Sequence, residues 1–103
     1  MLCLSEHGRT PRLNPRAKGG GRDHWSRAYR QVYAGGGMGR GNLVGSTDAI
    51  AADVRDTAVS PKDVLATAFH LLGIDPHTTV PDRSGRRMPV AGDGVVRPEL
   101  LGA

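Results

Sequence analysis

The feature that most constrains this chain is a single long apolar helix signal, SPKDVLATAFHLLG, at residues 60–73. Ser60 is a favoured N-cap residue, Pro61 suits the first helical position, and Asp63 complements the helix dipole from the first turn. Apolar residues then recur at helical spacing, and Gly73 is placed to end the helix. We therefore predict one amphipathic helix here, whose apolar face needs another layer to cover it.

Elsewhere the apolar residues occur in runs that are too short for helices. MLCLS at residues 1–5 has the pattern of the end of a buried strand, and residues 28–34 and 42–47 are two further strand candidates. Residues 8–22 are rich in glycine, proline and basic side chains, which predicts a loop. We expect a mixed α/β fold with few strands and one clear helix.

The composition predicts a thin core. Apolar residues make up 38% of the 103 residues, and Gly and Pro together account for 22 of them. The aromatic residues number only four. A chain of this length holds one domain at most, and this composition favours a loop-rich fold that forms one edge of a larger sheet.

Charge is distributed unevenly along the chain. Residues 1–40 carry eight Arg or Lys and two acidic residues, a net charge of +6, whereas residues 41–103 have a net charge of −2. A basic half favours an anionic partner, which could be nucleic acid, a membrane surface or a small phosphate or sulfate ester. No run of residues is apolar enough to span a membrane or to form a signal peptide.

Two acid–histidine pairs lie within the basic part of the chain, at Glu6-His7 and Asp23-His24. Imidazoles and carboxylates are ligands for zinc-like ions, so the pairs could supply up to four metal ligands. Neighbouring arginines could then bind an oxyanion bidentately. These arginines are Arg9, Arg12 and Arg22. The alternative is a solvated basic loop in which the histidines have no common role.

No residue stands out as a catalytic nucleophile. Cys3, the one cysteine, lies in the expected buried strand, where a thiol is normally inert, and it has no partner for an internal disulfide. The serines and threonines near the histidines lack the spacing of a nucleophile elbow. Trp25 follows His24 directly and either lines a site or packs at the rim of the core.

Several segments together resemble a known family. SEHGRTPRLN, GRDHW, AGGGMGRGNLVGSTD and VSPKDVLATAFHLLGIDPHTTVPDRSGRRMPV are similar, in this order, to the C-terminal part of a sulfatase-like family of unknown function within the alkaline phosphatase superfamily. The resemblance covers nearly the whole chain, and its specificity lies in the combination of motifs.

The resemblance implies an alkaline-phosphatase-like α/β sandwich around a mostly parallel sheet. It also implies hydrolysis of phosphate or sulfate esters with bound divalent metal, such as zinc, calcium or manganese. On this resemblance His7 and His24 would be metal ligands, Glu6 would stand where the superfamily has an aspartate, and Asp23 would bind the metal or orient a ligand. Asp23 and His24 rank first, because the sulfatase-like branch often has an aromatic residue at the position of His7.

The superfamily's nucleophile and several of its metal ligands belong to the N-terminal part of the fold. The resemblance therefore implies that residues 1–103 are a partial C-terminal segment of one larger domain, whose missing part would be a partner. We expect no turnover by this segment alone and an exposed apolar face on its helix. The alternative function is a basic loop that binds nucleic acid or another anion without catalysis, although the loop lacks the interleaved aromatics of single-strand binders.

Overall fold

The computed structural model describes residues 1–16 and 18–102. Within them the chain forms one α-helix, four antiparallel pairs of short strands and a 3-10 helix, which makes it a small mixed α/β protein. The chain divides into two units, of which the first comprises Met1–Ala34 with Leu43–Ala58 and the second comprises Gly35–Asn42 with Val59–Ala103. The mixed α/β class predicted from the sequence is confirmed at this level.

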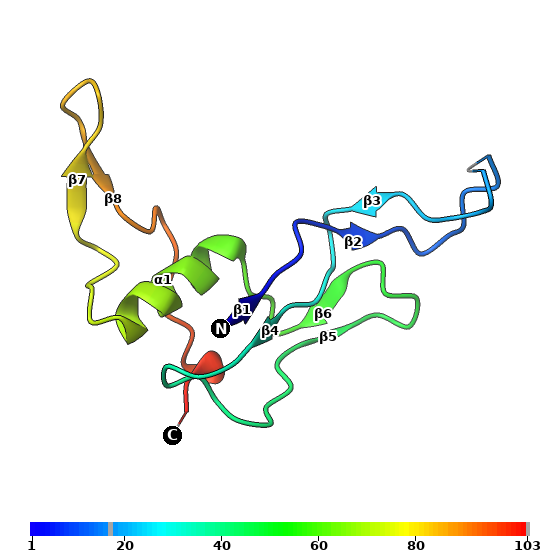
Figure 1. Cartoon of the computed structure of the whole chain (residues 1–103), viewed down its shortest axis with the longest axis horizontal. Coiled ribbons are helices and arrows are strands. Elements are labelled where there is room, and N and C mark those ends of the chain that lie inside the picture. The colour runs from blue at the N-terminus through cyan, green and yellow to red at the C-terminus, as the bar shows by residue number, and fades with distance from the viewer. Residues whose placement is uncertain (17, 103) are drawn as a thin grey trace. The chain divides into compact units, whose positions relative to one another are not determined.

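The first unit is built from three antiparallel strand pairs, drawn in blue to green in Figure 1. The pairs are β1 (Leu2–Cys3) with β4 (Val32–Tyr33), β2 (Gly8–Arg9) with β3 (His24–Trp25), and β5 (Ser46–Thr47) with β6 (Val54–Asp56). All the described pairs are antiparallel, whereas the resemblance implies a mostly parallel sheet. Each strand is only two or three residues long, so the unit is mainly loop.

The expectation that residues 1–5 form a buried strand is wrong about burial. Leu2 and Leu4 are 49% and 53% exposed, and Cys3 is exposed as well. An isolated pair of strands cannot bury either of its faces unless another layer packs on it. In the strand candidate at residues 28–34 only Val32–Tyr33 is a strand, and in the candidate at 42–47 only Ser46–Thr47 is one.

The second unit contains the predicted helix, α1 (Pro61–Leu71). The Asp63 N–H donates to Ser60 Oγ at 3.1 Å, and the Ser60 N–H donates to a carboxylate oxygen of Asp63 at 3.2 Å. This reciprocal pair is a capping box, with Pro61 in the first turn as predicted. Gly73 follows the helix with a φ of +78°, in the left-handed region that glycine adopts most readily.

The N-cap gives a direct test of the helix. Ser60→Ala removes the hydroxyl that accepts the Asp63 N–H, so we expect the free energy of unfolding to fall by about 1 kcal/mol. Urea unfolding followed by circular dichroism at 222 nm measures this change. Ser60→Asp restores an acceptor and should recover most of the loss, whereas equal losses in the two variants would contradict the role of the cap.

Few apolar residues are buried in the described chain, as the composition predicted. They are Ala28 in the first unit and Val64, Ala66 and Ala91 in the second. Leu65 on α1 and Leu72, the C-cap residue that follows it, remain 43% and 74% exposed, so the expected exposed apolar surface is found at these positions, while the C-terminal segment packs against other parts of the helix. None of the described helices is long and apolar enough to cross a membrane.

A β-hairpin follows the helix, in a segment where no strand was predicted from the sequence. Strands β7 (Thr79–Pro81) and β8 (Arg87–Pro89) pair in the register Thr79↔Pro89, Val80↔Met88 and Pro81↔Arg87, and are drawn in yellow and orange in Figure 1. The Asp82 carboxylate accepts the Ser84 and Arg86 N–H groups and so holds the turn. The chain then passes through the 3-10 helix η1 (Pro98–Leu100).

Candidate functional site

The β2–β3 ribbon brings the two histidines together. Its register pairs Gly8 with Trp25 and Arg9 with His24. Because alternate residues of a strand point to the same face, His7 and Arg9 share a face of the ribbon with His24. The His7 and His24 rings accordingly lie with their centroids 5.2 Å apart and their planes tilted by 34°. Two motifs separated by a long loop thus place their imidazoles side by side.

The carboxylates of the two pairs lie elsewhere. Asp23 precedes His24 directly, so its side chain points to the opposite face, where both carboxylate oxygens accept from the Asn14 amide at 3.2 and 3.4 Å. Glu6 is exposed, and no hydrogen bond or ion pair engages its side chain within residues 1–16 and 18–102. The same residues contain no group of three or more His, Cys, Asp or Glu side chains placed to hold a metal ion.

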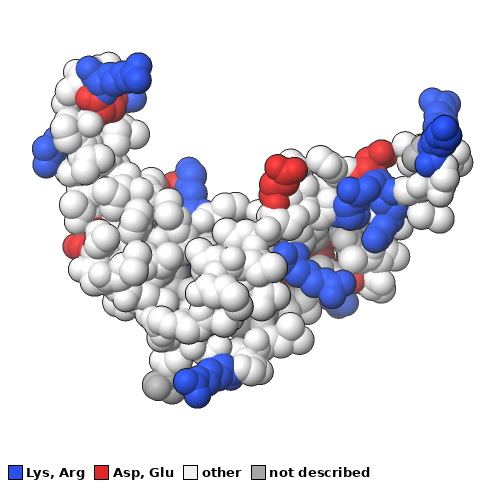
Figure 2. Space-filling model, viewed as in Figure 1, with Lys and Arg blue, Asp and Glu red and all other residues white. Residues whose placement is uncertain are grey.

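The three predicted anion-binding arginines do not share one position. The Arg9 guanidinium donates to the Arg22 carbonyl across the ribbon. Arg12 instead lines an open cavity of about 360 Å³, together with Arg16 and Asp23. Figure 2 shows Lys and Arg side chains both at the loop end of this ribbon and along its length. The basic character predicted for the loop is therefore present, but the guanidinium groups are spread along it.

Trp25 anchors the ribbon within its own unit. Its indole N–H donates to the Ala52 carbonyl at 2.6 Å, and the Arg27 guanidinium lies 5.8 Å from the ring centroid. Arg27 also forms an ion pair with Asp53 at 2.7 Å, but both side chains are largely exposed and the pair adds little stability. Trp25 is half-buried, and because adjacent strand residues face opposite sides, it has the packing role rather than lining the histidine pair.

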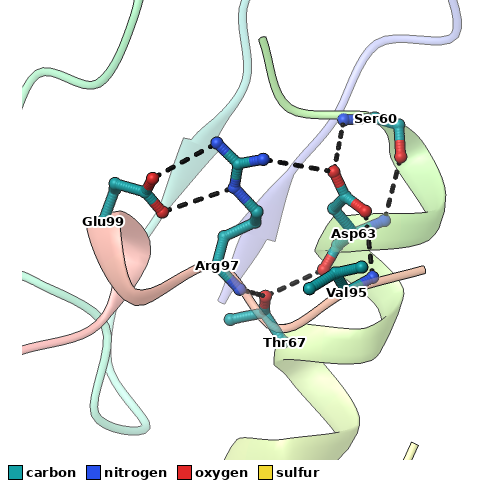
Figure 3. Close-up of polar contacts among 6 residues, drawn as sticks. All are labelled: Ser60, Asp63, Thr67, Val95, Arg97 and Glu99. Atoms are coloured by element: carbon teal, nitrogen blue, oxygen red, sulfur yellow. Dashed lines mark hydrogen bonds and ion pairs between the residues drawn. The ribbon is translucent and has the colours of Figure 1, made fainter. Parts of the chain in front are cut away.

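The most enclosed polar cluster of the second unit was not predicted from the sequence (Figure 3). Thr67 on α1 is fully buried; its hydroxyl donates to the Asp63 carbonyl at 2.8 Å and accepts the Arg97 N–H at 2.9 Å. Arg97 also extends its guanidinium to Glu99, with two contacts at 3.3 Å. The S-x-x-D cap marks Asp63 in the sequence, but no local pattern links Thr67 to Arg97, thirty residues later.

The Asp63 carboxylate is the centre of this cluster. It accepts the Val95 N–H at 3.0 Å, and Arg97 lies 3.8 Å away. The Val95 N–H, followed by the Ser60 backbone and hydroxyl groups and the Arg97 charge, lowers the pKa of Asp63 below its ordinary value, against the opposing effect of burial. Every buried side-chain polar atom of the described residues has a partner, so the cluster is a structural latch rather than an open reactive site.

Comparison with known proteins identifies one family. A family model described as "Protein of unknown function (DUF1501)" matches residues 1–101. No curated protein and no solved structure matches the chain.

Proposed function

This chain belongs to the DUF1501 family, whose description assigns no activity. From the chemistry of its residues, we propose that it contributes metal ligands to a hydrolase of sulfate or phosphate esters. The proposal places the chain in the sulfatase-like branch of the alkaline phosphatase superfamily. It includes an alkaline-phosphatase-like α/β sandwich to which residues 1–103 contribute a C-terminal part. The observation that carries it is the pairing of His7 and His24 across the β2–β3 ribbon.

The spacing of the two rings fits a shared metal ion. Imidazoles that bind one tetrahedral zinc ion at Zn–N distances of about 2.0–2.1 Å have ring centroids about 5 Å apart. The His7 and His24 centroids are 5.2 Å apart. Zinc titration distinguishes a metal-binding pair from a simple contact between aromatic rings, whose centroid distances fall in the same range.

Two imidazoles are fewer ligands than a catalytic zinc site takes from its protein, which is commonly three. Glu6 is exposed, but it precedes His7 as Asp23 precedes His24 and does not group with the two rings, so its carboxylate would become a third ligand only if it turned toward them. Asp23 is directed to Asn14 instead, and we propose that it fixes the ribbon next to His24 rather than binding the metal itself. The remaining ligands and the nucleophile would come from a further part of the domain, and the chain alone would not turn over substrate.

In such a site the metal would polarise a phosphoryl or sulfuryl oxygen. Arg9 lies on the same face as the histidine pair and could bind another oxygen of the ester through its planar guanidinium. Its present donation to the Arg22 carbonyl would hold the guanidinium in place. Arg12 and Arg22 lie further along the ribbon, where they would raise the local concentration of anions.

Zinc binding by the purified chain tests the proposal. We expect isothermal titration to give a saturable heat that both His7→Ala and His24→Ala weaken by at least about tenfold, since even the loss of a supporting group costs that much at metal sites. His77→Ala is the matched control, because His77 is an exposed histidine in a turn of the second unit. Asp23→Asn should keep most of the affinity if Asp23 only supports the ribbon.

Equal zinc affinity in the wild type and in both histidine variants would eliminate the metal site. The alternative function rests on a different observation, the run of exposed Arg and Lys side chains between β2 and β3. Binding of a DNA or RNA oligonucleotide that weakens steeply with salt, in a chain that binds no zinc, would favour that alternative.

A further inference from the structure

The glycine-rich turn GGGMGRG, at residues 35–41 of the second unit, has an unusual backbone. Gly35, Gly36 and Gly37 have φ angles of +82°, +64° and +97°, all in the region that side chains disfavour. The Met38 N–H donates to the Gly35 carbonyl at 3.1 Å and closes the turn. Turn conformations can direct successive backbone N–H groups toward a common anion.

The C-terminal segment holds one side of this turn. The Gly39 N–H donates to the Leu100 carbonyl at 2.9 Å, and the Gly102 N–H donates to the Gly37 carbonyl at 2.8 Å. Gly37 also lies close against α1, since a Cβ there would be 2.9 Å from Leu71 Cδ2. Several contacts therefore fix the conformation of the turn.

The other side of the turn is open. A Cβ at Gly35 or Gly36 would meet no atom within 4 Å. A cavity of about 370 Å³ adjoins the turn and is lined by Gly37, Met38, Arg40 and Gly102. This volume is within the range of small-ligand sites, and the cavity is open to solvent.

Three backbone donors in or next to this cavity have no internal acceptor, whereas the Met38 and Gly102 N–H groups are already bonded. Among the described residues, the N–H groups of Gly36, Gly37 and Arg40 donate to no backbone or side-chain oxygen. The Arg40 guanidinium likewise takes part in no ion pair of the described chain. No acidic residue lines the cavity. Backbone donors beside a free guanidinium are the combination that proteins use for phosphate and sulfate groups.

We propose that this turn binds a tetrahedral oxyanion, phosphate or sulfate, either free or as a monoester. Arg40 supplies a bidentate cation, and the N–H groups of the turn supply neutral donors. Met38 provides an apolar surface beside the anion for the organic group of an ester. The site belongs to the second unit and uses none of the residues of the histidine pair, so it stands independently of metal binding.

Nuclear magnetic resonance titration of the full chain, with EDTA present, tests this site. We expect inorganic sulfate and phosphate to cause saturable shifts in the Gly36, Gly37 and Arg40 amide signals. Arg40→Gln should weaken the binding about tenfold, the usual effect of losing one hydrogen-bonded charged group. Arg40→Lys keeps the charge but lacks the planar guanidinium, so its anion affinity should lie between that of the wild type and that of Arg40→Gln.

Arg83→Gln is the matched control, because Arg83 is an exposed arginine in the turn between β7 and β8 and should leave anion binding unchanged. Phenyl phosphate distinguishes the source of the anion: tighter binding than inorganic phosphate identifies an ester, and equal binding identifies the free ion. The proposal is overturned if the turn amides do not shift, or if Arg40→Gln and Arg83→Gln weaken binding equally. His24→Ala should bind anions with the affinity of the wild type. The anion-binding proposal can therefore be tested independently of the zinc-binding proposal.

Discussion

Asp63→Ala should lower the free energy of unfolding by about 2–3 kcal/mol, since it removes an N-cap partner and a charged hydrogen-bond acceptor together. The substitution leaves the Val95 N–H and the Arg97 guanidinium without their carboxylate (Figure 3). The Ser60 N–H loses its acceptor as well. Urea unfolding at neutral pH measures the change, and hydrogen exchange at the Val95 amide reports directly on the detachment of the C-terminal segment.

Asp63→Asn is the matched control, because it keeps an acceptor oxygen and removes only the charge. The pKa of Asp63 is held below its ordinary value of 3.8, most strongly by the Val95 N–H. A carboxyl group of this kind contributes stability that is present above the unfolded-state pKa and is lost as the pH falls through the folded-state pKa. The stability difference between wild type and Asp63→Asn should therefore be constant near neutral pH and shrink below about pH 4.

The pKa of Asp93 is also lowered, chiefly by its contact with Lys62, but this contribution is common to the wild type and Asp63→Asn and cancels in their difference. A difference in stability that stays constant into acid would contradict the role of the Asp63 charge. Equal protection of the Val95 amide in Asp63→Ala and wild type would show that the carboxylate does not hold the segment.

Gly94→Ala is expected to cost about 3 kcal/mol, at the upper end for overpacking a closely packed site. A Cβ at Gly94 would collide with the carbonyl group of Lys62 on α1, 2.5 Å from its carbon atom. The obstacle is helix backbone, which cannot move aside as a flexible side chain can. We expect the C-terminal segment to be displaced from α1, with loss of the Arg97 N–H bond to Thr67.

Gly85→Ala separates this collision from the ordinary cost of replacing glycine. Gly85 has a φ of +80°, and a Cβ there would meet no atom within 4 Å, so the substitution should cost about 1 kcal/mol through backbone strain alone. Thermal and urea unfolding of the two variants give the comparison. If Gly94→Ala costs no more than Gly85→Ala, the close approach of residue 94 to the helix is not important for stability.

Features that depend on neighbouring residues were predicted from the sequence better than features that depend on long-range contacts. The helix at residues 60–73 was predicted with its cap, its proline and its terminating glycine, because each of these acts on neighbouring backbone groups. The short strands were predicted less well: the burial of residues 1–5 was wrong, and the hairpin β7–β8 was missed. Strand pairing depends on which segment lies opposite, and dipeptide strands carry almost no periodic signal.

In the candidate site, too, the sequence showed the residue types but not their arrangement. It marked the two acid–histidine pairs, but it gave no sign that the carboxylates would lie away from the imidazoles. In the structure His7 and His24 meet, while Asp23 bonds to Asn14 on the other face of the ribbon. Alternation along a strand decides this outcome once β2 and β3 pair, and that pairing is not visible in either motif alone.

The amino-acid order alone was sufficient for the helix, the basic loop, the small core and the residue types available for metal and anion chemistry. These features arise from neighbouring residues and from composition, so no folded partner is needed to define them. Tertiary contacts alone determined the histidine pair, the Asp63–Thr67–Arg97 latch and the fixed glycine turn. Each of these joins segments far apart in the chain, and such contacts form only when packing and backbone hydrogen bonds outweigh the entropy lost in closing the loops between them.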